Sequence, residues 1–110
     1  MDTEEAIAAL ASLAQPTRLE AFRLLVRHEP DGLPAGELAR RLAVPPNTLS
    51  AHLNVLTHAG LTRAARKGRS VVYRASIARL TALTAFLGED CCGGAGCASP
   101  VMTNCAASTT

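Results

Sequence analysis

The apolar positions of the first thirty residues recur at the spacing of two amphipathic helices. In residues 3–14 the apolar side chains fall three or four positions apart, and Thr3 is a permitted N-cap before them. Pro16 is acceptable in a first helical turn and opens a second stripe, which consists of Leu19, Phe22, Leu25 and Val26. The sequence Pro30-Asp31-Gly32 then ends the second helix.

Two shorter helices are expected next, separated by paired prolines. We predict a helix over about residues 34–42, and Val44-Pro45-Pro46 blocks its continuation because proline has no amide hydrogen to donate. Pro46 can start a fourth helix that runs to about Ala59 and stops at Gly60. About one third of its circumference is apolar, formed by Leu49, Leu53 and Leu56. The third helix and this fourth helix, which has one packing face and one polar face, together predict a helix-turn-helix.

A hairpin and a last helix complete the pattern. Residues 61–66 and 70–75 are β-compatible and are joined by Lys67-Gly68-Arg69, which gives a hairpin with a cationic tip. Ser76 begins a helix that Gly88 ends. The predicted fold is therefore mostly α with a small β part: a winged helix-turn-helix of about five helices and a two-stranded wing. We expect it to span residues 1–88, followed by a flexible, cysteine-rich tail over residues 89–110.

The first and last helices carry more apolar surface than a three-helix winged core needs. A chain of 110 residues with only 3% aromatic residues builds a small core, and such cores are marginal alone. Packing these two helices on a second copy predicts a homodimer joined through its N- and C-terminal helices. If the helix-turn-helix binds DNA, the fourth helix of each subunit would meet one of two half-sites about 34 Å apart on a pseudo-palindromic sequence.

Charge is distributed unevenly along the chain. From Leu38 to Gly88 there are eight Lys and Arg residues and no Asp or Glu, which suits a face that binds double-stranded DNA. The predicted DNA contacts are Asn47, Thr48, Ser50 and His52 on the fourth helix and Arg66, Lys67 and Arg69 on the wing. The alternatives are a solvated basic surface, an ordinary helical bundle, or a winged helix used for protein contact.

Several motifs in this order resemble the ArsR/SmtB family of metal-responsive repressors. They are residues 10–19 (LASLAQPTRL), 38–42 (LARRL), 48–56 (TLSAHLNVL), 59–61 (AGL) and 68–73 (GRSVVY). The resemblance covers about residues 5–87 and implies a dimeric repressor that leaves its operator when it binds an inducer. Pro46, Asn47 and Ala51 depart from the residues that members commonly carry there, so the operator sequence does not carry over.

All four cysteines lie in the last twenty residues, after a cysteine-free body. Thiolates are soft ligands suited to soft ions. Members of the resembled family place inducer sites on the third helix, as a Cys-x-Cys pair, or on the last helix, as His, Asp and Glu. Residues 36–39 contain no thiol and residues 76–88 contain none of those three residue types. The tail instead resembles the C-terminal cysteine site of some arsenite-responsive members.

The tail fits the chemistry of trivalent arsenic, which takes three sulfur ligands in a pyramid. Adjacent Cys91 and Cys92 can supply two, and the glycines that follow let the chain fold back so that Cys97 supplies the third. Cys105 is the expected spare thiol, and Sb(III) should bind as As(III) does. Three alternatives stay open: Zn(II) or Cd(II) held by four thiolates, a disulfide redox switch, and an unliganded tail.

Other features bear on location and class. No segment approaches the roughly 20 apolar residues that cross a bilayer, and the acidic N-terminus is unlike a signal peptide, so we expect a cytoplasmic protein with reduced thiols and no membrane contact. Vicinal thiols also serve in oxidoreductases, but no base or cofactor-binding glycine motif accompanies them here. We therefore predict a regulator and no enzyme.

Overall fold

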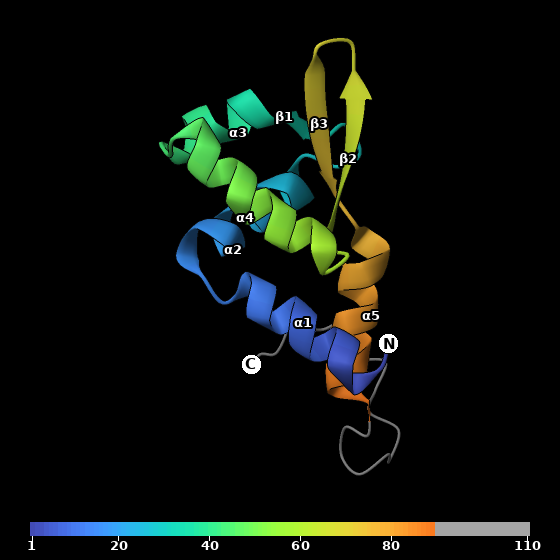
Figure 1. Ribbon diagram of the computed structural model, residues 1–110. Coiled ribbons are helices and arrows are strands. Elements are labelled where there is room, and N and C mark those ends of the chain that lie inside the picture. The colour runs from blue at the N-terminus through green and yellow to red at the C-terminus, as the bar shows by residue number, and fades with distance from the viewer. Residues whose placement is uncertain (90–110) are drawn as a thin grey trace.

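The computed structural model describes residues 1–89, which form five helices and three strands (Figure 1). In chain order these are α1 (Thr3–Leu13), α2 (Pro16–Arg27), β1 (Leu33–Pro34), α3 (Ala35–Leu42), α4 (Pro46–His58), β2 (Thr62–Lys67), β3 (Ser70–Ala75) and α5 (Ile77–Gly88). The β2–β3 hairpin, called the wing below, projects from the cluster of α2, α3 and α4. Helices α1 and α5 lie side by side at the end away from its tip (Figure 1). The predicted winged helix-turn-helix is confirmed.

The helix starts follow local hydrogen bonding. Asp2, and not Thr3 as the pattern suggested, caps α1: its Oδ1 accepts from the Glu5 N–H at 2.8 Å, and Glu5 Oε1 accepts from the Asp2 N–H at 3.0 Å. This reciprocal pair satisfies two amides that the helix leaves free, so the start moves one residue earlier than a Thr3 cap would set it. Ser76 caps α5 by accepting from the Arg79 N–H at 3.2 Å.

The sheet has a third strand that the sequence did not reveal. Strand order is β1-β3-β2, all antiparallel, with Leu33 opposite Tyr73 and Pro34 opposite Val72. Two residues give no alternation to detect, and Pro34 argues against a strand. Gly32, at φ +76, makes this pairing possible: a Cβ there would lie 2.3 Å from the Tyr73 carbonyl oxygen.

Buried leucines form the centre of the core. Leu25, Leu38, Leu49, Leu53, Leu56 and Leu61 are each 1% exposed or less. Helix α1 contributes Ala6, Ala9 and Ser12, and not the stripe of larger residues in residues 3–14: Ile7 is 60% exposed and Leu10 42%. On α5, Leu83 is buried while Ile77 and Leu87 are exposed. The expected surplus of apolar surface on the two terminal helices is thus present.

Among the helices of residues 1–89, none has the length and apolar character needed to span a membrane.

Candidate nucleic-acid interface

The turn between α3 and α4 sets the angle of the helix-turn-helix. Ala43 adopts the left-handed conformation at φ 56, and the Val44 N–H then donates to the Ala39 carbonyl at 3.1 Å. This bond satisfies a carbonyl in the last turn of α3. Pro45 and Pro46 follow and start α4, as the sequence predicted. Two helices of fixed direction therefore meet through only three residues.

Helix α4 has one face for packing and one for solvent. Leu49, Leu53 and Leu56 are buried, whereas the polar residues Asn47, Thr48, Ser50 and Asn54 are exposed. Short hydroxyl and amide side chains can hydrogen-bond to base edges in a major groove. The sequence predicted both faces correctly, and we name α4 the reading helix.

The amino end of the reading helix is open to an anion. Pro45 is its N-cap and, within residues 1–89, no side chain accepts a hydrogen bond from its first turn. Unpaired amides at a helix start, together with the positive end of the helix dipole, bind phosphate oxygens well. The same end carries Asn47 and Thr48, so backbone and side-chain contacts would occur together.

His52 lies differently from the other predicted DNA contacts. It is half-buried, and its Nδ1 lies 3.4 Å from Nη1 of Arg18 on α2. A guanidinium only donates, so a hydrogen bond between these two atoms has Nδ1 as its acceptor. One side of the imidazole therefore faces the protein body, and its contact with DNA stays a prediction.

The structure divides the eight basic residues of segment 38–88 into two groups. Four hold carboxylates from outside the segment, in the pairs Arg40–Glu37, Arg41–Glu37, Arg74–Glu29 and Arg79–Glu5. The other four have no ion-pair partner within residues 1–89, and they are Arg63, Arg66, Lys67 and Arg69. Within the basic segment, the positive charge that no carboxylate balances therefore lies on the wing.

Strand alternation sends the wing cations to opposite faces. Thr62 is buried against the body, so Arg66, four positions on, shares its face, while Arg63 and Lys67 lie on the outer face. Arg69 sits in the turn after Gly68, whose φ of +63 suits a two-residue loop. Cations on both faces can reach different phosphates. Arg63 was not among the predicted contacts, although the two-residue period of β2 would have placed it with Lys67.

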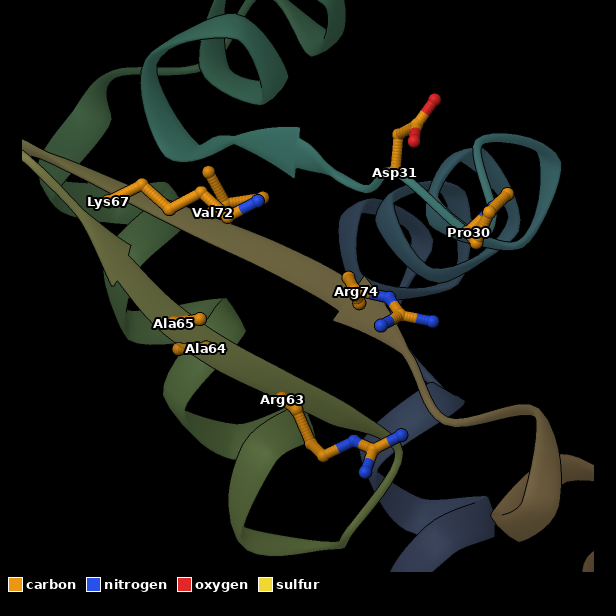
Figure 2. A pocket seen from close by; sticks show the side chains of 8 residues that line it. All are labelled: Pro30, Asp31, Arg63, Ala64, Ala65, Lys67, Val72 and Arg74. Carbon is orange, nitrogen blue, oxygen red and sulfur yellow. The ribbon is translucent and has the colours of Figure 1, made fainter.

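The outer face of the wing is hollowed next to the loop between α2 and β1. Figure 2 shows Arg63 and Arg74 on neighbouring strands, with Ala65 and Val72 beyond them and Asp31 across the gap. Arg63 and Arg74 are direct cross-strand partners, and like charges in that position repel. Glu29 relieves this by accepting from Arg74 Nη2 at 2.8 Å, and the hydrogen bond and charge of Arg74 lower the pKa of Glu29.

The predicted metal ligands Cys91, Cys92 and Cys97, and the spare thiol Cys105, lie outside the described residues. Within residues 1–89 no group of three or more His, Cys, Asp or Glu residues is placed to hold a metal ion. The cysteine site therefore stays a prediction.

The chain is similar to known regulators in sequence and in structure. A family model described as a helix-turn-helix domain matches residues 13–63. Among curated proteins, none matches the chain.

Three solved structures illustrate the similarity. An ArsR-like transcriptional regulator from Rhodococcus sp. RHA1 shares 33% identity, with 76% of each chain covered and a TM-score of 0.67. The homodimeric winged helix-turn-helix DNA-binding domain Mb0332 from Mycobacterium bovis, a possible ArsR-family regulator, shares 27% identity, with 79% of this chain and 81% of that chain covered and a TM-score of 0.64. Reduced HlyU from Vibrio cholerae N16961 shares 29% identity, with 82% of this chain and 92% of that chain covered and a TM-score of 0.65.

The winged helix-turn-helix fold agrees with these relatives. The chain therefore belongs to the ArsR family of winged helix-turn-helix transcriptional regulators, and it is a DNA-binding regulator rather than an enzyme.

Proposed function

We propose that this regulator is a repressor that binds double-stranded operator DNA as a homodimer and is released when As(III) or Sb(III) binds Cys91, Cys92 and Cys97. The observation that carries the proposal is the junction at the end of α5. The helix ends at Gly88 with Glu89 as its C-cap, and the first of the thiols follows two residues later. An inducer bound by these thiols is thus attached directly to a terminal helix.

The terminal helices offer the surface for the second subunit. Ile7 and Leu10 on α1, and Ile77 and Leu87 on α5, are each at least 40% exposed. Exposed apolar side chains on two adjacent helices favour burial against a symmetry mate. The related domain from Mycobacterium bovis is described as homodimeric. We therefore assign the dimer contact to α1 and α5.

DNA recognition divides between two elements. Asn47, Thr48 and Ser50 on the reading helix select bases, with His52 at the edge of that face. Arg66, Lys67 and Arg69 on the wing bind phosphates irrespective of sequence. Uncompensated charge on the wing, and the exposed polar face of α4, support this division.

The inducer acts by changing the dimer. Three soft sulfur ligands satisfy trivalent arsenic, and the glycines between Cys92 and Cys97 permit the chain reversal that this requires. Ordering of the bound tail beside α5 then favours another arrangement of the subunits. A coupling of about 1 to 3 kcal/mol would lower operator affinity about 5- to 150-fold. The reaction suits the cytoplasm, where thiols stay reduced.

The test is a mobility-shift titration of the reduced protein on its upstream DNA with arsenite, antimonite, cadmium and zinc. Cys91→Ser, Cys92→Ser and Cys97→Ser should bind DNA like the wild type and stay bound when arsenite is added. Cys105→Ser is the matched control and should dissociate normally. Truncation after Asp90 should give DNA binding without release. Normal release from the three serine variants, or from the truncated protein, would exclude the proposed site.

A thiol redox switch is the second candidate, and one relative favours it. HlyU from Vibrio cholerae is described in a reduced state. In this chain, a disulfide between Cys91 and Cys92, or between Cys92 and Cys97, would replace the arsenic complex. Diamide in the absence of metalloid distinguishes the two, because a redox switch releases DNA with diamide and rebinds it after dithiothreitol. Release by cadmium or zinc alone would point instead to a tetrahedral thiolate site.

A further inference from the structure

We propose that Arg18 and Arg79 are positioning residues that fix the reading helix to the dimer-forming helices and thereby set the separation of half-sites that the dimer accepts. This inference rests on the proposed dimer contact through α1 and α5. It adds two side chains that neither sequence pattern nor resemblance singled out for this role.

Arg18 joins three helices. Its backbone N–H, in the first turn of α2, donates to Gln15 Oε1 at 2.8 Å, which holds the residue in place. Its side-chain Nε donates to the Ser12 carbonyl oxygen, in the last turn of α1, at 2.6 Å. That turn has no basic residue of its own, so Arg18 supplies the cation that a helix carboxyl end favours. Its Nη1 meets His52 on the reading helix.

Arg18 contacts the reading helix at its middle, and Arg79 contacts it at its carboxyl end. From the first turn of α5, its Nε donates at 3.3 Å to the carbonyl oxygen of Ala59, the C-cap of α4. Its Nη1 lies 3.9 Å from Glu5 Oε2 on α1. Gly60 leaves the space for this contact, since a Cβ there would lie 2.9 Å from Arg79 Nε.

Three buried leucines hold the reading helix in the core, and the hydrogen bonds of Arg18 and Arg79 add a direction to the packing between α1 and α4. An open hollow of about 370 Å³ lies between them, and it is lined by Ala8, Ala11, Ser12, Arg18, Val55, His58 and Ala59. Small residues leave room for tilt, whereas two guanidinium groups bound to specific oxygen and nitrogen atoms define a direction. Among the side-chain hydrogen bonds of residues 1–89, those of Arg18 and Arg79 are the ones that connect α4 to α2 and α5.

The experiment measures affinity against half-site separation. The half-sites are located by footprinting on the upstream DNA, and duplexes are made with the natural spacing and with one or two base pairs inserted or removed. The wild type should bind the altered spacings about tenfold or more weakly than the natural spacing, because two rigid reading helices must meet successive major grooves. Arg18→Gln and Arg79→Gln should bind the natural spacing several-fold more weakly and distinguish the spacings by about threefold or less.

Matched controls separate positioning from general damage. Arg23→Gln removes an exposed arginine from α2 that has no hydrogen-bond partner within residues 1–89, and it should keep the wild-type spacing profile. His52→Leu should flatten the profile as Arg18→Gln does, and the double variant should be no worse than either single change. His58→Leu should have no effect on spacing, because within the described chain the His58 ring hydrogen-bonds only to the Asn54 carbonyl of its own helix.

The outcomes distinguish the two proposals. A wild type that ignores spacing contradicts the rigid dimer, and sedimentation velocity then shows whether dimerisation itself is absent. A wild type with a sharp profile, and arginine variants that lose affinity equally on every spacing, would show that Arg18 and Arg79 only stabilise the fold. Arg18→Lys should fall between wild type and Arg18→Gln, since one ammonium group cannot reproduce the fork geometry.

Discussion

The reading helix and the wing are neighbours in the chain but are held in opposite ways. Three leucines that are 1% exposed or less anchor α4, and it carries no Lys, Arg, Asp or Glu. In β2 only Thr62 is buried, and three of the six residues are cations without an ion-pair partner in residues 1–89. The difference indicates a division of labour. Selecting bases requires a fixed element, while holding phosphates requires charge and tolerates movement.

The largest effect should come from loosening the fixed element. Leu53→Ala removes a side chain that is fully buried, and we expect a loss of about 2–5 kcal/mol in the free energy of unfolding. Val71→Ala in the wing, which is half-buried, should cost about 1 kcal/mol or less. Urea denaturation followed by circular dichroism gives both values. Equal losses of unfolding free energy in the two variants would contradict the contrast between a fixed reading helix and a loosely held wing.

The loop before β1 and the tip of the wing should respond differently to the same substitution. Gly32→Ala combines a positive φ with a Cβ placed 2.3 Å from a backbone oxygen, so at least about 2 kcal/mol should be lost. Gly68 also has a positive φ, but a Cβ added there would meet no atom of the described residues within 4 Å. Gly68→Ala should therefore cost only about 1–2 kcal/mol, the conformational penalty alone. Thermal unfolding of both variants tests the difference.

Base selection by the reading helix and phosphate binding by the wing can be separated in DNA-binding measurements. Asn47→Ala should change the preference for operator over a mismatched site by about 1–3 kcal/mol if this side chain reads a base. The triple variant Arg66→Gln, Lys67→Gln, Arg69→Gln should weaken operator and unrelated DNA alike. Its plot of log affinity against log salt should be shallower by about 0.9 for each phosphate that the wing no longer neutralises. Fluorescence anisotropy at several salt concentrations measures both quantities. A triple variant that changes preference between sequences would assign base reading to the wing.

The smallest effect concerns the cations that already pair with carboxylates of the same chain. Hydrogen bonds from Arg40 and Arg41 lower the pKa of Glu37 from 4.5 to about 2. A carboxyl with a depressed pKa stabilises the folded state above its unfolded pKa, and this contribution disappears as pH falls from about 4.5 to about 2. These hydrogen bonds lie at the protein surface, so the difference between wild type and Glu37→Gln should be small at pH 7. Urea titrations at pH 7, 4.5 and 2.5 should show that difference shrinking toward zero.

Sequence alone located the elements better than their partners. Pro16, the pair Pro45-Pro46 and Gly60 interrupt the chain by local chemistry, so the helix limits were predictable within about two residues. Periodicity could not tell which face of α1 packs inward, because Ala6 and Ala9 allow a closer approach than Ile7 or Leu10. A repeat of apolar residues does not say whether its partner belongs to the same chain.

Contacts between residues far apart in the sequence could not be predicted, for a different reason. Arg74 and Glu29 are 45 positions apart, and Arg18 and His52 are 34 apart, so no local spacing signals either pair. The charge pattern alone therefore counts all eight cations of the basic segment alike, although carboxylates already hold four of them. The cysteine site was inferred from ligand chemistry and resemblance, and it stays a prediction because its residues lie beyond residue 89.

The order of strands gives the wing charges a second consequence. With β3 in the middle, β2 lies at the margin of the sheet, where backbone amides and carbonyls would invite a strand from another molecule. Arg63, Arg66 and Lys67 along that margin repel an identical strand, which is a common protection against edge-to-edge aggregation. Neutralising them to weaken DNA binding should therefore also lower the solubility of the protein.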